Sequence, residues 1–272
     1  MMELDQNAAK LFLQVSNTLL NSLTSTIAAS DLMAKQLERQ PEIPAYESLS
    51  NQLAALRHNQ FRVLRVAENM KTLASLELKT TSLRRETVDL AQLCGDLADS
   101  CRVLVPDIPV TLLPVYDSFL CSCDPGLIEQ LLLNLLANSF LHCKAGEEVR
   151  IHLRRTEKTI QIILSDNGSG IPRENMETLF SDYLRDSDFS DFVRGAGLGL
   201  SVAEAIARAH GGSLALTSEP GHGTKAVFSL PHTWNAELRG NRAVYHSNGR
   251  MRSILVGLSD VCDYHKFLSK FL

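Results

Sequence analysis

A seven-residue repeat of apolar side chains restricts what the N-terminal part of this chain can fold into. The repeat has two interleaved series, Leu49, Leu56, Val63 and Met70 in one and Leu53, Ala67 and Ala74 in the other. Sustained over about four heptads, such a pattern predicts one long helix with a coiled-coil-like apolar seam. We expect this helix to begin near Tyr46.

A second long helix is predicted before it, where an apolar residue recurs every four positions from Leu11 to Ile27. Pro41 and Pro44 separate the two helices, because proline cannot continue a helix. Two helices alone bury too little apolar surface. We therefore expect residues 1–82 to form an antiparallel helical hairpin that pairs with a second copy as a four-helix bundle. The alternative is a hairpin that packs on its own domain.

The pattern changes to short mixed elements in residues 83–231. Helices are expected at 88–104, after Asp124-Pro125 and at 201–209, and strands at 110–113, 149–154, 159–164, 213–217 and 224–230. Asp124 is suited to cap its helix, and Gly211-Gly212 to end the later one. Helices and strands distributed in this way predict an α+β fold, a two-layer α/β sandwich.

Residues 232–272 are predicted to form a separate C-terminal extension. Two β-rich runs, 242–246 and 252–256, flank Ser247-Asn248-Gly249. Because Asn-Gly between such runs is a strong hairpin signal, we expect a β-hairpin here, followed by a short helix from Tyr264 to Leu272.

Composition limits the classes of function. The 272 residues carry a net charge of −4, which argues against nucleic acid or acidic membranes as partners. The most apolar stretch, 127–141, contains Glu129 and Asn134, so no membrane span is predicted. Cys121 and Cys123 form the only closely spaced cysteine pair, and a reduced cytosolic protein explains them better than a metal site. A cytoplasmic location is expected.

Four segments carry residues suited to chemistry, beginning with the apolar helix that contains Asn134 and Asn138. Their i, i+4 spacing places both amides on one face. A carboxamide oxygen can bind a phosphate-associated Mg²⁺. Taken alone, an interhelical or helix-end contact explains the pair better.

The second segment is Asp166-Asn167-Gly168-Ser169-Gly170, which follows an apolar strand. An aspartate at a strand end can accept a hydrogen bond from the amino group of adenine, and the glycines let a flat ring approach the backbone. An ordinary turn is the alternative interpretation.

The third and fourth segments are also glycine-rich. Gly195-Ala196-Gly197-Leu198-Gly199 leads into a helix, whose N-terminus can bind phosphate through its backbone amides. Gly221-His222-Gly223-Thr224 leads into a strand, and alone it is consistent with a simple hairpin.

In this order, the four segments resemble the ATP-binding domain of sensor histidine kinases, in the superfamily shared with gyrase and certain chaperones. The resemblance covers roughly residues 10–231. Asn134 and Asn138 match the asparagine box, Asp166-Asn167-Gly168-Ser169-Gly170-Ile171-Pro172 the first glycine box, Leu179–Tyr183 the phenylalanine box, and the third and fourth segments the remaining glycine boxes.

The resemblance implies ATP and Mg²⁺ as ligands. Asp166 would bind the adenine amino group, with Gly168 and Gly170 beneath the ring and Thr224 supporting the base. Asn138 would hold Mg²⁺ beside Asn134. The phosphates would contact Arg185 and the segment that contains Gly195, Gly197, Leu198, Gly199 and Leu200. Gyrase-like ATPases have a glutamate at the position of Asn134, so its absence favours phosphoryl transfer over fast hydrolysis.

The sequence departs from the family where the phosphoacceptor histidine is expected. Asn17 takes that position and Thr18 takes that of the adjacent acid. An amide nitrogen is no nucleophile, and threonine is no base near neutral pH. His58 is the weak alternative acceptor, expected on the polar side of the helix. Leu141 also replaces a residue that is usually basic.

The predicted function is a histidine-kinase-like signalling protein, a homodimer that binds Mg-ATP and transfers phosphate to a histidine of a partner. The partner would be a response regulator or another kinase. The alternative is a non-catalytic pseudokinase or phosphotransfer-like scaffold. A Ser/Thr kinase of the anti-sigma-factor type is disfavoured by the long hairpin.

Overall fold

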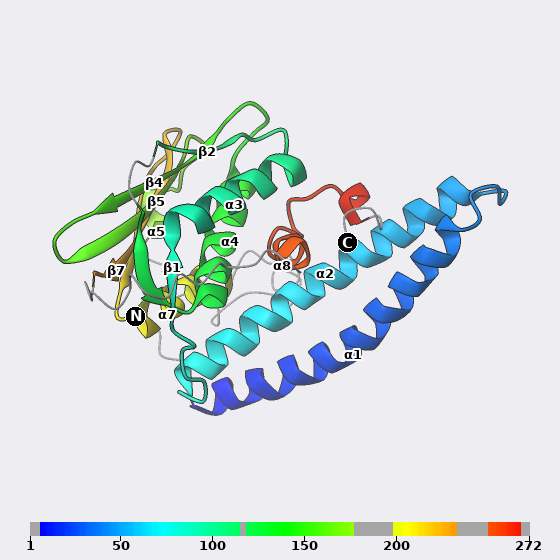
Figure 1. Cartoon of the computed structure of the whole chain (residues 1–272), viewed down its shortest axis with the longest axis horizontal. Coiled ribbons are helices and arrows are strands. Elements are labelled where there is room, and N and C mark those ends of the chain that lie inside the picture. Colours follow the sequence, from blue (N-terminus) through cyan, green and yellow to red (C-terminus); the bar gives the residue numbers. More distant parts are fainter. Residues whose placement is uncertain (1–5, 115–117, 177–197, 233–249, 268–272) are drawn as a thin grey trace.

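The fold is taken from a computed structural model of the chain, and residues 6–114, 118–176, 198–232 and 250–267 are described. Two long helices, α1 (Gln6–Glu38) and α2 (Tyr46–Glu77), form the predicted antiparallel hairpin (Figure 1). The connection contains Pro41 and Pro44, and Ala45 adopts a left-handed conformation (φ 75°) directly before α2. The turn falls where the prolines predict it.

The elements that follow the hairpin are a mixture of helices and strands. In chain order they are β1 (Glu86–Asp89), α3 (Leu90–Leu104), β2 (Val110–Leu112), β3 (Leu120–Cys123), α4 (Pro125–His142), β4 (Val149–Arg155), β5 (Thr159–Asp166), α5 (Arg173–Met176), α7 (Leu198–Ala209), β6 (Ser213–Glu219) and β7 (Gly223–Pro231). The described part of the extension adds α8 (Arg250–Gly257) and the 3₁₀ helix η3 (Tyr264–Phe267).

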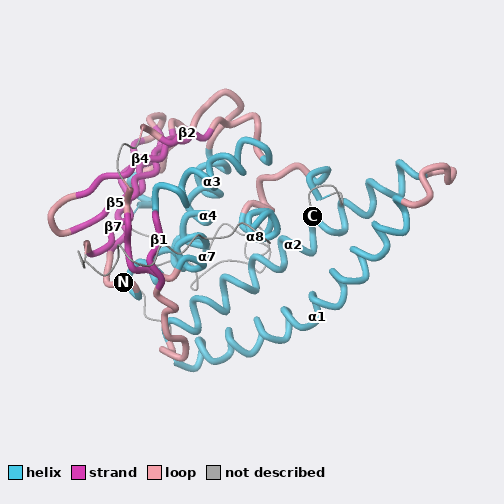
Figure 2. The backbone as a smooth tube through the Cα atoms, in the orientation of Figure 1, coloured by secondary structure: helices cyan, strands magenta, loops and turns pink. Residues whose placement is uncertain are grey.

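The main sheet has the order β2-β4-β5-β7-β6, with β2 parallel to β4 and all other neighbours antiparallel. A separate two-stranded sheet pairs β1 with β3. Side chains along β4 alternate between buried and exposed, so one face of the main sheet is covered. Helices α3, α4 and α7 lie beside that sheet (Figure 2), giving the predicted two-layer α/β sandwich.

Helix α4 is the centre of the core because it is apolar on nearly all sides. Its start is set by Asp124, whose side chain accepts the backbone N–H of Leu127 at 3.2 Å, and by Pro125 in the first turn. Leucines between 131 and 136 are almost fully buried. This burial fixes α4 between the sheet and the other helices.

Helix α2 joins the hairpin to the sandwich. It contacts α7, α8 and η3, while the hairpin tip projects away from the sheet (Figure 1). The side of α2 near the sandwich carries buried polar residues, Arg65 and Asn69 among them. The hairpin is thus docked on the domain through one helix.

The C-terminal extension differs from the prediction. Residues 252–256, expected as the second strand of a hairpin, lie within helix α8. Ile254, Leu255 and Val256 are buried, because α8 packs against α2, α3 and α4, and this packing overrides the strand preference of the β-branched residues. Only Tyr264–Phe267 of the predicted final helix is described, as a 3₁₀ turn. Residues 242–249 and 268–272 lie outside the described residues.

Candidate functional site

The carboxylate of Asp166, at the end of β5, is held by three donors. Its Oδ1 accepts the backbone N–H groups of Gly168 (3.2 Å) and Thr224 (3.0 Å), and its Oδ2 accepts the hydroxyl of Ser139 (2.9 Å). A carboxylate offers about four acceptor positions. One position therefore remains for a further donor, such as an exocyclic amine.

Glycine is required around Asp166 for a reason other than the predicted approach of a ring. A Cβ at Gly168 would lie 2.5 Å from the carbonyl oxygen of His142. Gly170 has φ +66°, and its Cβ would lie 2.0 Å from the carbonyl oxygen of Glu219. The protein's own backbone fills this space, so these glycines fix the turn that presents Asp166.

Thr224 supports the same corner through two groups. Its backbone N–H bonds Asp166, and its hydroxyl lies 2.9 Å from the hydroxyl of Ser218. Ser218 donates to the carbonyl of Gly223 (2.8 Å) and accepts the N–H of Ile171 (2.9 Å). This network ties the first glycine segment to the start of β7.

Asn138 lies on α4, one turn after Asn134, and its side chain is half-buried. Within the part of the chain that the structure describes, its amide makes no hydrogen bond. A carboxamide oxygen without a protein donor suits a hard cation such as Mg²⁺. Gly199 is buried at the first turn of α7, and its Cβ would come within 3.4 Å of the Asn134 side chain.

The remaining predicted phosphate contacts are only partly described. Leu198 is buried and Leu200 half-buried at the start of α7, as core residues. Arg185, Gly195 and Gly197 lie outside the described residues.

Asn134 makes the interhelical contact that the sequence left as an alternative. It is 2% exposed, and its amide exchanges two hydrogen bonds with Asn69 of α2, each 3.2 Å. Arg65 Nη2 lies 3.5 Å from the same oxygen. Both the oxygen and the NH₂ group of the Asn134 amide are therefore hydrogen-bonded to helix α2 of the hairpin.

Arg65 is held from the other side by the C-terminal extension. It forms an ion pair with Asp260, which also pairs with Arg62 at 2.9 Å. Burial lowers the pKa of Arg65, and the charge of Asp260 opposes that shift. Sequence reasoning missed Asn69, Arg65 and Ser139 as partners of the site. The available signal was the presence of polar residues on the buried side of α2 and α4.

The candidate acceptors have different surroundings. Asn17 is exposed on α1, and the hydroxyl of Thr18 donates to the carbonyl of Gln14 at 3.0 Å. His58, predicted on the polar side, is half-buried: its Nε2 donates to the carbonyl of Ser259 (2.6 Å), and its ring lies 4.9 Å from that of Phe267.

Cys143 is the cysteine that lies beside the turn of Asp166. Burial raises the pKa of Cys143, whose Sγ packs beside Gly168, to about 12. Cys121 and Cys123 are both buried in the core of the domain.

Within the described ranges there is no cluster of three or more His, Cys, Asp or Glu side chains able to hold a metal, and no helix long and apolar enough to cross a membrane.

Residues 123–233 match the family described as histidine kinase-, DNA gyrase B- and HSP90-like ATPases. This range contains Asn134, Asn138, Asp166 and the glycine segments that surround them. These residues belong to a domain of that ATPase type. Among the described residues of this range, the turn after β5 and the start of β7 meet at Asp166, and Gly199 at the start of α7 lies beside Asn134 of α4.

The chain is similar to curated sensory kinases, in some cases over most of its length. The adaptive-response sensory kinase SasA of Microcystis aeruginosa is 31% identical over 232 residues, 80% of this chain and 58% of the relative. SasA of Synechococcus elongatus is 37% identical over 129 residues, 47% of this chain and 32% of the relative. The chain thus spans little more than half the length of the first of these relatives and about a third of the second.

Solved structures support the fold. The Acinetobacter baumannii histidine kinase AdeS has a TM-score of 0.54 and 20% identity, over 79% of this chain and 98% of that chain. Full-length ShkA in complex with AMPPNP has a TM-score of 0.60 and 21% identity, over 89% of this chain and 54% of that chain. Each likeness covers more of the chain than the sandwich alone.

Proposed function

We propose that the chain binds Mg-ATP and transfers the γ-phosphoryl group to a protein histidine in two-component signalling. The observation that carries the proposal is the carboxylate of Asp166, oriented by Ser139, Gly168 and Thr224 with one acceptor position remaining. Asn138 would hold Mg²⁺, which would neutralise phosphate charge. The N-terminus of α7 would face the phosphates with its backbone amides.

The residues of this chain position the nucleotide rather than react with it. Asp166 would fix the adenine, and the start of α7 would orient the phosphates for in-line attack. An imidazole nitrogen of the acceptor forms the new P–N bond while the bond to the β-phosphate oxygen breaks. ADP leaves with the electron pair, and the imidazole loses its proton to solvent. Asn134 is no general base for water, so transfer is favoured over hydrolysis.

The acceptor would belong to another protein. The exposed Asn17 has no nucleophilic nitrogen, and the Nε2 of His58 is engaged by the carbonyl of Ser259. A partner kinase or phosphotransfer protein would supply the histidine, and a response regulator would receive the phosphate from it. The cytoplasmic location remains a prediction from the sequence.

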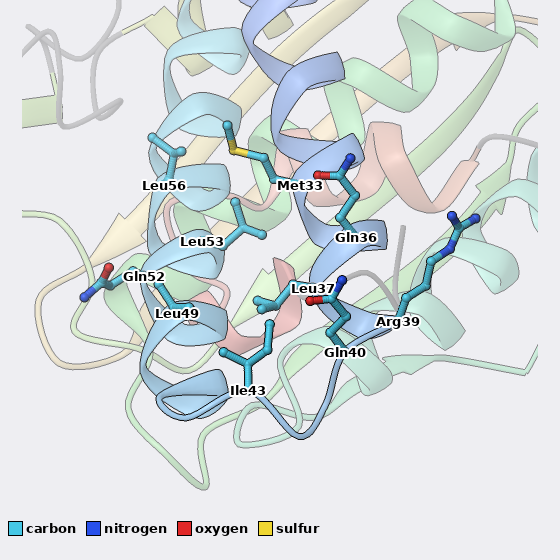
Figure 3. A pocket seen from close by; sticks show the side chains of 10 residues that line it. All are labelled: Met33, Gln36, Leu37, Arg39, Gln40, Ile43, Leu49, Gln52, Leu53 and Leu56. Atoms are coloured by element: carbon cyan, nitrogen blue, oxygen red, sulfur yellow. The ribbon is translucent and has the colours of Figure 1, made fainter.

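Homodimerisation is supported by apolar residues that a single chain leaves in solvent. On α2, Leu49, Leu56 and Val63 are 44%, 49% and 38% exposed, and they belong to the predicted heptad series. Leu49 and Leu56 also line a groove of about 730 Å³ at the hairpin tip (Figure 3). Met33, Leu37 and Ile43 point into the same groove from α1 and the connection. A second hairpin would cover this surface as a four-helix bundle.

The test is incubation with γ-labelled Mg-ATP, with and without a histidine phosphotransfer domain as acceptor. We expect acid-labile, base-stable label on the acceptor and none on the chain alone. Label on the chain that is lost in His58→Gln would instead identify an unusual internal acceptor. Acid-stable label would indicate Ser/Thr chemistry and contradict the proposal.

A non-catalytic scaffold is the second candidate, favoured by Asn17 and by the commitment of Asn134 to the hairpin. It predicts measurable binding of a partner kinase or response regulator without phosphoryl transfer. Nucleotide binding without label on any acceptor would select it over the kinase.

A further inference from the structure

The described part of the C-terminal extension, residues 250–267, lies between the hairpin and the ATP-binding domain (Figure 1). We call it the C-terminal clamp. On the hairpin side it contacts α2 and on the domain side α3 and α4. It is therefore placed to control how the two parts sit together.

The clamp contacts α2 through ion pairs and through an aromatic contact. Asp260 pairs with Arg62 and Arg65, and the side chains of Asp260 and Arg65 are only 5% and 4% exposed. Phe267 is buried against Phe61, with ring centroids 5.3 Å apart. Removal of the Asp260 charge would leave the guanidinium of Arg65 buried without its counter-charge, so this contact is sensitive to a single change.

The clamp is also fastened to the domain. Ser253 donates to the carboxylate of Glu129 on α4 at 2.6 Å, and Lys266 donates to the carbonyl of Val103 on α3 at 2.9 Å. At Gly257 a Cβ would lie 2.8 Å from Leu133, so α8 approaches α4 closely. The hairpin and the ATP-binding domain are thus both in contact with the C-terminal clamp.

By holding α2 in place, the clamp also keeps two residues of α2 against Asn134 at the candidate nucleotide site. Arg65, fixed by Asp260, and Asn69 together occupy the amide of Asn134. That amide has one oxygen and one NH₂ group, and both face α2. A nucleotide-bound Mg²⁺ next to Asn138 can use Asn134 only after α2 withdraws.

We propose that the C-terminal clamp is an autoinhibitory device that holds α2 against Asn134 and so competes with Mg-ATP. This inference rests on the proposed function. Because linkage is reciprocal, release of the clamp strengthens Mg-nucleotide binding, and bound Mg-nucleotide loosens the clamp. A partner that displaces residues 250–267 would activate the protein.

The experiment compares the wild-type chain with Asp260→Asn and Asp263→Asn. Asp263 is a matched control, since it lies on the same segment but forms an exposed pair with His265. Hydrogen exchange of α2 and of residues 250–267 is measured without nucleotide. Affinity for a non-hydrolysable Mg-ATP analogue is measured by calorimetry. Phe267→Ala, which removes an aromatic contact and no charge, serves as a second clamp variant if Asp260→Asn fails to fold.

In Asp260→Asn we expect faster exchange in both segments and at least about fivefold tighter Mg-nucleotide binding, the lower range of allosteric coupling. Asp263→Asn should resemble wild type in both measurements. Unchanged exchange in both clamp variants, or faster exchange with unchanged affinity, overturns the inhibitory role. Absence of nucleotide binding in every protein overturns the proposed function together with it, and the two failures are thereby distinguished.

Discussion

Asn69 of α2 and Asn134 of α4 exchange two amide hydrogen bonds, each 3.2 Å long, in a buried position between the hairpin and the ATP-binding domain. Gln130 extends this contact by donating to the side-chain oxygen of Asn69 at 2.9 Å. Helix α4 is therefore hydrogen-bonded directly to helix α2 of the N-terminal hairpin.

Asn69→Ala should destabilise the protein by about 1–3 kcal/mol, because the amide of Asn134 then stays buried without its partner. Asn134→Ala should have a similar cost, and the double variant should cost less than the sum of both. Urea denaturation measures each value. Asn59→Ala, an exposed position on the same helix, is the control and should change stability little. Additive effects of the two substitutions would contradict the contact.

Gly223→Ala should be far more damaging than Gly221→Ala. Both glycines have positive φ angles, 83° and 78°, so both substitutions strain the backbone. Only at Gly223 does the added Cβ meet backbone, 2.0 Å from the carbonyl oxygen of Asp166. Thermal unfolding and nucleotide affinity should both fall for Gly223→Ala, while Gly221→Ala keeps its affinity. Equal losses of stability and affinity in the two variants would show that the backbone strain of a positive φ, and not the contact with Asp166, determines the effect.

His210 should make stability depend on pH. Its Nδ1 donates to the carbonyl of Ile206 (2.8 Å) and its Nε2 accepts the N–H of Asp124 (3.0 Å), so the buried ring is neutral. Burial lowers its pKa below 6.5. The unfolded chain then binds the proton more readily, and stability present above pH 6.5 is lost as the pH falls.

The measurement is the free energy of unfolding of wild type and His210→Gln between about pH 7.5 and about pH 5.5. The stability difference between the two proteins should shrink as the pH is lowered. A difference that stays constant over this range would mean that His210 does not carry the pH dependence.

Leu56→Glu should break the proposed dimer. An uncompensated carboxylate in an apolar seam costs several kcal/mol, so the dimer dissociation constant should rise by about 100-fold or more. Light scattering coupled to size-exclusion chromatography reports the mass. Leu141→Glu is the matched control, since Leu141 is 41% exposed but lies on the ATP-binding domain. A wild-type monomer, or a dimer unaffected by Leu56→Glu, would exclude this interface.

Local signals predicted most of the fold. The prolines at 41 and 44 located the hairpin turn, and Asp124-Pro125 located the start of α4, because caps and prolines act within a few residues. The pairing of Asn134 with Asn69 could not be predicted, because it joins residues far apart in sequence. The spacing of Asn134 and Asn138 indicates a shared face but not which partner covers it.

The C-terminal extension was predicted wrongly at residues 252–256 for the same reason. Their β-branched composition favours a strand locally, whereas contacts with α2 and α4 stabilise helix α8. His58 shows the same limit: its heptad position indicated exposure, but Ser259 and Phe267 from the extension cover it.

The central claim is that the carboxylate of Asp166 binds the amino group of an adenine nucleotide. Calorimetric titration of wild type and Asp166→Asn with Mg-ATP tests this claim. The asparagine keeps the shape but turns an NH₂ group toward Ser139 and the adenine amine. We expect wild type to bind and the variant to bind at least about tenfold more weakly, a loss of about 1.4 kcal/mol or more. Purine riboside triphosphate, which lacks the amine, should bind both proteins similarly. Equal ATP affinity in the two folded proteins would contradict the account.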